Sequence, residues 1–402
     1  MTDRQTAGAE PNVVYVLPDK MGGVAANVGD LLRHGRPDGF RCHVVLTRQA
    51  ASQDTPFGEA LDADTSTVVE HRLPLENLWS ALRRLARAIP RGPGVLVAND
   101  WMELALLSVH DPGRTVIQIL HGDHDYYDDL AVKHEDLVDA FAVLSRTGFD
   151  RLERRLPHRR DAIFRLPFGV RLDVPTRAPS PGPLRLLFVG RFARAKGLAD
   201  LPLIDQALEA RGVPRTWTLV GAGPDAADLV DWGRASAHVR QLGARPSAEI
   251  AAICAGHDAF VLPSRAEGLP RALLEAMAAG VVPVASDLPS GIRDVVTPGI
   301  SGHLPAPGDV AGFADALAAL HGDRAHLEAL GRAARQTVVE RFDVRRRALD
   351  YAALYARWRE LRRPRPARPA LHYGSRLDRP WLPNAVVAAA RTVRRFLPAA
   401  WR

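Results

Sequence analysis

The stretch AFVLPSRAEGLPRALLEAMAAGVVPVAS, residues 259–286, decides the fold of the second half of this chain. It begins and ends with short apolar runs without polar alternation, which are typical of strands buried on both faces. Between them lies a helix pattern that should begin near Pro270, because proline suits the first turn of a helix and is costly further inside. Ser264 and Glu267 have the spacing of a capping box, but a helix starting there would contain Pro270. Strand, helix and strand in this order predict a parallel sheet covered by helices.

The same alternation of apolar strands and helices fills most of the chain. Five further strand-like runs precede residue 150, and a second series begins with LRLLFVG near residue 184. Between the two series lies LDVPTRAPSPGPL, whose four prolines exclude a regular element. We therefore predict an α/β protein with two Rossmann-like doubly wound parallel-sheet domains, at residues 1–174 and 184–342, joined by a linker at 175–183. Ligands bind at the carboxyl ends of the strands in such sheets, so the expected site is a cleft between the two halves.

The composition is that of a packed globular protein, with 402 residues, 47% apolar and 25% charged. Two cysteines, Cys42 and Cys254, are too few for a disulfide framework, and we expect both to be buried thiols in a reducing compartment. The start of the chain lacks the apolar core of a signal peptide, and no apolar run is long enough to cross a bilayer. We therefore expect a cytoplasmic protein.

The net charge of +7 is concentrated in the C-terminal tail, since residues 351–402 contain twelve arginines, no lysine and two acids. A nucleic-acid partner is not expected, because the rest of the chain is not basic. Residues 343–363 form a C-terminal helix that can cross back to the first domain, in a segment that looks helical from residue 341. Residues 364–402 form an Arg/Pro-rich tail with a short amphipathic segment between Trp381 and Trp401. That segment, residues 381–402, fits either peripheral contact with the inner face of a membrane or packing on the first domain, and both alternatives stay open.

Two features of the second half indicate an anion site. Arg191 and Lys196 follow the strand LLFVG, where cations are well placed for phosphate, although ordinary surface charge is an alternative. Free backbone N–H groups at the start of the helix near Pro270 form a second anion site together with the helix dipole. The glycine loop VGAGPDA lacks the acidic residue that a dinucleotide fingerprint needs about twenty residues later, so we interpret it as a lining of the same cleft.

The segments VGRF-x-R-x-KG, VGAGP, QLG and PSRAEGLPRALLEAMAAGVVPVAS, in this order and spacing, resemble the retaining glycosyltransferases of family 4, which have the GT-B fold. The resemblance runs from about residue 186 to residue 342 and is weak in the first half. It implies that Arg191 and Lys196 hold the donor diphosphate, that Glu267 contacts the donor sugar near the reacting carbon, and that Glu275 binds the ribose hydroxyls.

The resemblance implies a role for further residues on both sides of the cleft. His121 resembles the family histidine near the transferred carbon, with a structural histidine as the alternative. The glycine pair at residues 22 and 23 would let the backbone approach the donor, with a plain strand-to-helix turn as the alternative. The expected catalytic residues are His121 and Glu267. The expected donor-binding residues are Gly22, Gly23, Arg191, Lys196, Gly268, Leu269, Pro270, Arg271 and Glu275.

The function implied by the resemblance is hexosyltransferase-type transfer with retention, from a nucleoside-diphosphate sugar to a hydroxyl of a glycan or lipid-linked acceptor, in cell-envelope glycan or glycolipid biosynthesis. We expect no cofactor and no metal. The leaving phosphate is expected to help deprotonate the acceptor, so that no protein nucleophile is needed. The alternatives are a sugar-nucleotide epimerase of the same fold, or a non-catalytic nucleotide- or glycan-binding scaffold.

The segment HGDHDYYDD, residues 121–129, is dense in polar groups directly after a strand. Its Asp-His-Asp triplet, residues 123–125, has the D-x-D form found in metal-dependent transferases of a different fold. It lies in the wrong half for a donor site, so we do not expect a metal there. Residues 126–129, two tyrosines and two aspartates, either line the acceptor side or form a surface loop.

Overall fold

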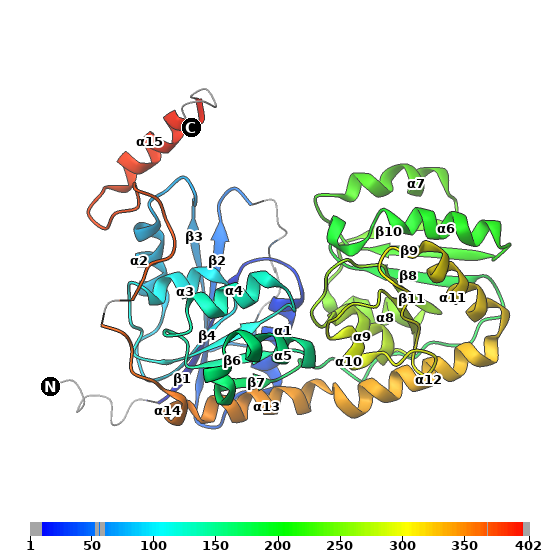
Figure 1. Cartoon of the computed structure of the whole chain (residues 1–402), viewed down its shortest axis with the longest axis horizontal. Coiled ribbons are helices and arrows are strands. Elements are labelled where there is room, and N and C mark those ends of the chain that lie inside the picture. The colour runs from blue at the N-terminus through cyan, green and yellow to red at the C-terminus, as the bar shows by residue number, and fades with distance from the viewer. Residues whose placement is uncertain (1–9, 53–55, 57–60, 368, 397–402) are drawn as a thin grey trace.

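The computed structural model describes residues 10–52, 56, 61–367 and 369–396. It has two α/β domains side by side, each built on one parallel sheet (Figure 1). The first sheet has seven strands in the order β3-β2-β1-β4-β5-β6-β7, and the second has five in the order β10-β9-β8-β11-β12. In each sheet the chain starts in the middle, winds outward to one edge and then returns to the other side of the first strand. This is the predicted doubly wound topology, and it leaves a switch point beside β1 and another beside β8.

In the first domain, a short 3₁₀ turn, η1 (Pro157–Ala162), precedes the last strand. The strands and helices are β1 (Asn12–Pro18), α1 (Gly23–His34), β2 (Arg41–Gln49), β3 (Thr65–His71), α2 (Leu78–Ala88), β4 (Gly94–Ala98), α3 (Trp101–Leu107), β5 (Thr115–Leu120), α4 (Asp125–Lys133), β6 (Ala140–Val143), α5 (Arg146–Arg155) and β7 (Ile163–Arg165). Successive side chains of a strand point to opposite faces. On β1, Val13 and Tyr15 therefore join the apolar cluster that contains α1, whereas Val14 and Val16 join the one that contains α2 and α3.

The second domain repeats this construction over residues 184–341. Its elements are β8 (Leu184–Val189), η2 (Arg194–Lys196), α6 (Asp200–Ala210), β9 (Arg215–Val220), η3 (Ala226–Leu229), α7 (Val230–Ala235), β10 (Val239–Gly243), α8 (Ser247–Ala255), β11 (Ala259–Leu262), α9 (Arg271–Ala278), β12 (Val282–Ala285), α10 (Ile292–Val295), α11 (Val310–Gly322) and α12 (Arg324–Arg341). Helix α9 starts directly after Pro270, as the sequence predicts. The capping-box alternative is wrong, because Ser264 Oγ donates to Glu267 Oε1 at 2.6 Å inside the loop that precedes the helix.

The chain returns to the first domain through α13 (Val344–Ala356) and α14 (Trp358–Leu361), before the tail and α15 (Asn384–Phe396). Tyr351 on α13 donates its hydroxyl to the carbonyl of Leu166 at 2.6 Å. The helix begins at Val344 rather than at 341, because Asp343 caps it by accepting a hydrogen bond from the N–H of Arg345. The chain leaves the first domain near Val170, in the outward crossing, and comes back near Asp343, in the return crossing. These two crossings lie side by side, since the N–H of Val170 donates to the carbonyl of Phe342 at 2.8 Å.

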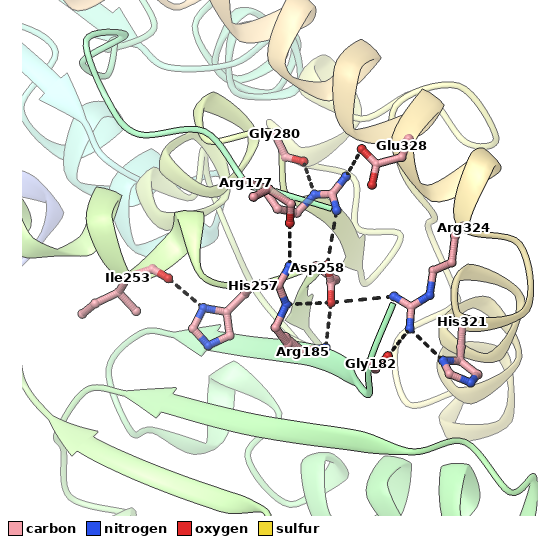
Figure 2. A network of polar contacts seen from close by, with 11 residues as sticks. Arg177, Gly182, Arg185, Ile253, His257, Asp258, Gly280, His321, Arg324 and Glu328 are labelled. Atoms are coloured by element: carbon pink, nitrogen blue, oxygen red, sulfur yellow. Dashed lines mark hydrogen bonds and ion pairs between the residues drawn. The ribbon is translucent and has the colours of Figure 1, made fainter. Parts of the chain in front are cut away.

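Ion pairs and hydrogen bonds hold the proline-rich segment at 175–183 on the second domain (Figure 2). Arg177 is 3% exposed and contacts Asp258 at 3.2 Å and Glu328 at 2.7 Å. Asp258 is fully buried at the start of β11 and also pairs with Arg185 at 2.8 Å and with Arg324 at 3.8 Å. Burial alone would raise the pKa of Asp258, but the hydrogen bonds from Arg185 hold that pKa below its usual value. Because residues 175–183 belong to the second domain, the chain connects the two domains only through the short pair of crossings around residues 170 and 343.

Candidate active site

A cavity of about 1020 Å³ lies between the two domains, where the carboxyl ends of both sheets face each other. From the first domain it is lined by the loops after β1, β4 and β5. From the second domain it is lined by the loops after β8, β9 and β11 and by the first turns of α9. Every residue expected at the site lies on this cavity: Gly22, Gly23, His121, Arg191, Lys196, Glu267, Gly268, Leu269, Pro270, Arg271 and Glu275.

The loops after β8 and β11 bring a cation and a carboxylate together. Lys196 Nζ lies 2.7 and 2.8 Å from the two carboxylate oxygens of Glu267. The side chain of Glu267 is only 5% exposed, and Ser264 supplies it with a second donor. Arg191 lines the same cavity on the loop that follows β8. A phosphate approaching the two cations and a hydroxyl approaching Glu267 would both find a charged partner here.

Glu275 lies about one turn into α9 and is held from two sides. Its Oε1 accepts from Ser247 Oγ at 3.0 Å and from Arg271 Nε at 2.9 Å. Burial raises the pKa of Glu275, and the neighbouring guanidinium of Arg271 opposes this shift. Both hydrogen bonds use the same oxygen, so the carboxylate is oriented by the protein while Glu275 lines the cavity.

Arg271 connects Glu275 to the first domain. Its Nη2 donates to Asp30 of α1 at 2.6 Å, and its Nη1 lies 3.5 Å from the carbonyl oxygen of Gly169 in the outward crossing. The guanidinium also lies over the ring of Phe168, 5.8 Å from its centroid. Arg271 was expected only as part of an anion-binding helix start. The structure makes it a bridge between both domains, because Asp30 approaches from a helix that is 241 residues away in the sequence.

On the opposite wall, His121 is held as a neutral imidazole. Asn99 donates its amide N–H to the carbonyl of Val16 at 2.8 Å, so its Oδ1 is left to accept. His121 Nε2 lies 2.8 Å from that Oδ1 and therefore carries the ring proton. Burial lowers the pKa of His121 to about 3. Near pH 7 this histidine can form hydrogen bonds to a ligand, but it is not a protonated acid.

The loop that carries Asn99 is held in place by hydrogen bonds to α3. The backbone N–H groups of Asn99 and Asp100 both donate to Glu103 Oε1 at 2.5 Å, and the Asp100 side chain caps the helix in return. Glu103 is fully buried, and burial raises its pKa to about 8. The cavity wall around His121 is therefore a fixed surface rather than a loose loop.

A second contact between the domains lies beside His121. Asp123 Oδ2 accepts from Ser145 Oγ at 2.6 Å and from the backbone N–H of Gly291 in the second domain at 3.1 Å. Burial raises the pKa of Asp123 to about 6, although these two donors oppose the shift. Gly268 approaches the same loop so closely that a Cβ atom there would lie 2.7 Å from the Cα of Gly122.

The acidic segment after His121 divides between the cavity and the surface. Tyr127 lines the cavity, and Tyr126 donates its hydroxyl to Asp100. The two aspartates at 128 and 129 do not line the cavity, because Asp128 pairs with Arg151 at 2.6 Å and Asp129 with Arg155 at 2.7 Å. The Asp-His-Asp triplet at 123–125 does not converge either, since Asp125 also pairs with Arg151 and Asp123 faces Ser145 and Gly291.

Sequence reasoning missed three residues that orient the site, namely Asp30, Asn99 and Ser247. Asn99 had a signal, because it is a polar residue directly after an apolar strand. Asp30 and Ser247 had none, since each lies in an ordinary helix and acquires its role only through contact with Arg271 or Glu275.

Comparison with known proteins agrees with this geometry. Residues 183–323 match the family described as glycosyl transferases group 1. The chain is similar to a glycogen synthase from Mycobacterium tuberculosis, with 34% identity over 201 residues that cover 49% of this chain and 48% of the relative. It is also similar to a putative colanic acid biosynthesis glycosyltransferase, WcaL, from Salmonella typhimurium, with 34% identity over 41% of this chain and 43% of the relative. The chain thus spans about half the length of the curated relatives it matches.

The fold extends this likeness to both domains. The structure of HepE from Anabaena, in complex with UDP and glucose, superposes with a TM-score of 0.68 at 18% identity over 85% of this chain and 99% of the other. At this level of identity the superposition shows the fold alone. The chain therefore resembles the group 1 glycosyl transferases in the sequence of its second domain and has the two-domain GT-B fold.

Proposed function

We propose that this protein is a retaining glycosyltransferase that moves a hexose-type sugar from a nucleoside-diphosphate sugar to a hydroxyl acceptor, without a metal ion. The observation that carries the proposal is that two cations and two carboxylates of the second domain line the same cavity as His121 and the glycine pair of the first. The relative whose name describes a putative colanic acid biosynthesis glycosyltransferase, and the UDP and glucose in the structure of HepE, support the same class of donor and reaction.

In the proposed donor complex, the diphosphate lies against Arg191 and Lys196 and the first turn of α9. Lys196 moves from Glu267 toward the phosphate, which leaves the Glu267 carboxylate to accept hydrogen bonds from the sugar hydroxyls. The free oxygen of Glu275 accepts from the ribose. Cations and backbone N–H groups fixed in a partly dry cavity stabilise the charge that develops on the leaving group.

The reaction breaks the bond between the anomeric carbon and the diphosphate oxygen, and the electron pair leaves with the diphosphate. The acceptor oxygen forms its new bond on the same face of the sugar, and its proton passes to the departing phosphate oxygen. His121 fits a hydrogen-bonding role toward the sugar, because its lowered pKa makes it a weak base and keeps it uncharged. The acceptor would enter from the first-domain side, beside Gly22, Asp100 and Tyr127.

The first test is a thermal-shift screen of the purified chain against UDP, GDP, ADP and dTDP, with and without EDTA. A hundredfold excess of ligand over its dissociation constant stabilises the fold by about 2.7 kcal/mol, which corresponds to roughly 5–10 °C for a domain of this size. We expect one nucleotide to give this shift in both conditions, and Glu275→Ala to lose it. Glu340→Ala, on an exposed position of α12, is the matched control and should keep the shift.

The nucleotide found in this way then selects the sugar donors for an activity assay. Proton NMR of the product should show the same anomeric configuration as the donor, which identifies retention. An inverted product would reject the mechanism, and an epimerised nucleotide sugar released without transfer would replace it with the epimerase alternative. Absence of any nucleotide shift would reject the donor site itself.

A further inference from the structure

The C-terminal tail is anchored at the start of α2 by a set of polar contacts. The N–H of Leu78 donates to Asp378 Oδ1 at 2.7 Å, and the N–H of Asn77 donates to Asn384 Oδ1 at 2.7 Å. The side chain of Asn77 returns two hydrogen bonds, to the carbonyls of Arg379 at 2.9 Å and Leu382 at 2.8 Å. These contacts satisfy backbone N–H groups that a helix start leaves free, so the tail is part of the folded domain here. The packing alternative for this part of the tail is therefore correct.

Helix α15 packs on the first domain with one face, and its other face is exposed. Val387 is fully buried, and Arg391 faces inward, where it pairs with Asp378 at 2.5 Å. The opposite face is apolar, with Val386 51% and Val393 61% exposed and two exposed alanines at 389 and 390 between them. Trp381, just before the helix, is 75% exposed. Helix α15 thus turns Arg391 toward Asp378 and leaves Val386, Val393 and the alanines between them exposed.

The position of this face follows from the sheet topology. The strands of the first sheet are parallel, so the loops that follow them all lie at the carboxyl end of the sheet. The loop between β3 and α2, which holds the tail, therefore lies at the same end of the sheet as the loops after β1, β4 and β5. Those three loops line the acceptor side of the cavity. Figure 1 shows α15 at the outer end of this domain, beside α2 and away from the second domain. Tyr373 of the tail also packs on Trp101, with ring centroids 5.2 Å apart, next to the cavity-lining Asp100.

The charge around the face indicates what covers it. Residues 364–402 contain eight arginines, no lysine and one acid. Helix α2 beneath them adds three arginines and no acid, and the exposed Arg83 donates to the carbonyl of Pro380 at 2.7 Å. A second copy of this chain would set two arginine-rich surfaces against each other, whereas an anionic lipid surface would attract them. Tryptophan at the edge of an apolar stripe is typical of the boundary between lipid and water.

We propose that Trp381 and the outward face of α15 form a docking face for an anionic membrane surface. Among the described residues no helix is long and apolar enough to cross a bilayer. Helix α15, with thirteen residues or about 20 Å, would lie in the plane of the interface instead. Combined with the proposed function, on which this part rests, the location implies that the acceptor is lipid-linked, because docking brings the acceptor side of the cavity to the membrane. Residues 397–402, including Trp401, lie outside the described residues and are not needed for this argument.

The test is flotation of the full chain with vesicles of phosphatidylcholine alone or with about one third phosphatidylglycerol. We expect flotation only with the anionic vesicles, reduced at high salt. The double variant Val386→Glu with Val393→Glu should reduce bound protein at least tenfold, and Trp381→Ala should reduce it several-fold. Arg83→Ala should weaken binding by a factor on the order of five, since one arginine near the surface contributes that much.

Matched controls separate docking from general hydrophobicity and from folding. Leu203→Glu on α6 and Leu349→Glu on α13 replace side chains that are 50% and 59% exposed, and both should float like the parent protein. All variants should keep the parent melting temperature. Equal flotation of the parent and the double variant, or flotation that ignores lipid charge, would overturn the proposal. So would a parent that is dimeric by light scattering and a double variant that is monomeric, with neither binding vesicles, because the face would then bind a second copy.

The nucleotide screen separates this inference from the proposed function. Vesicle binding without any nucleotide shift would leave the docking face standing and remove the transferase proposal. A nucleotide shift in a protein that does not bind anionic vesicles would leave the transferase proposal standing and remove the docking face. If both hold, the double variant should lose transfer to a lipid-linked acceptor in vesicles and keep transfer to the same acceptor in detergent.

Discussion

Gly268→Ala tests whether the arrangement of the two domains described above is the one that reacts. The added Cβ would lie 2.7 Å from the Cα of Gly122, 3.0 Å from the carbonyl oxygen of His121 and 3.3 Å from the backbone N of Asp123. All three atoms belong to the backbone of the other domain, so no side chain can rotate away. Gly268 is not among the glycines with positive φ, so its backbone suits alanine.

The magnitude follows from these distances. Carbon atoms in contact lie about 3.5–4.0 Å apart, so the two loops must separate by about 1 Å to accommodate the methyl group. A displacement of that size between a bound substrate and a catalytic group costs roughly a hundredfold in rate. The donor site itself lies within the second domain and keeps all its charges. We therefore expect about a hundredfold loss of kcat/KM for transfer, with nucleotide affinity changed by less than about threefold.

The assay measures release of nucleoside diphosphate from the donor identified by the thermal-shift screen, with and without acceptor. Nucleotide binding is measured separately by calorimetry. Gly322→Ala is the matched control, because a Cβ there would meet no atom within 4 Å, and it should behave like the parent protein. Unchanged turnover in Gly268→Ala would refute the reasoning, since the contact between Gly268 and Gly122 would then not belong to the reacting state. A large loss of nucleotide affinity would place the effect in the donor site instead.

Three further predictions concern buried charges, two of them beside the cleft and one in the network that holds the linker. Burial raises the pKa of Asp123 to about 6. The folded protein therefore binds this proton more tightly than the unfolded chain, so stability falls as the pH rises from about 4 to 6, by about 3 kcal/mol at most. Asp123→Asn should flatten the melting temperature over this range, and an unchanged pH profile would contradict the assignment. Asp30→Asn and Arg271→Met should be coupled by about 1–3 kcal/mol in urea unfolding, because the two side chains share a nearly buried ion pair, and additive effects would argue against it. Asp258→Asn should lower the unfolding free energy of the second domain by about 3 kcal/mol, because it removes the buried carboxylate that Arg177, Arg185 and Arg324 share, and a loss below about 1 kcal/mol would count against this network.

Much of the fold could be predicted because its signals are local. Strands β4, β5 and β6 are buried along their whole length and β1 up to Leu17, and such apolar runs are visible in the sequence. Strand β3 was not predicted for the corresponding reason. It lies at the edge of the sheet with most of its residues exposed, so its sequence, TSTVVEH, carries no continuous apolar run.

The candidate site divides in the same way. The motif residues Lys196, Glu267 and Glu275 could be assigned to a cleft because the first two follow strands, Glu275 lies in the first turns of the helix that comes next, and the order of these motifs resembles that of a known family. Their partners could not be assigned, since Ser247 and Asp30 reach Glu275 and Arg271 only after separate helices have packed together. The tail left two alternatives open, because periodicity shows that a helix is amphipathic and does not show which face is covered.

The sequence by itself determined most of the order of strands and helices, apart from β3 and β7, the doubly wound topology and the end of each sheet at which the polar residues gather. These properties depend on hydrophobic periodicity and on turn chemistry within a few residues. Only the tertiary structure decided that Arg271 bridges the domains and that Asp123 accepts a hydrogen bond from Gly291. It also decided that α15 turns Val387 and Arg391 inward and leaves Val386 and Val393 exposed. Each of these contacts joins residues that are distant in the chain or depends on the surface against which a helix packs, and no local pattern encodes that choice.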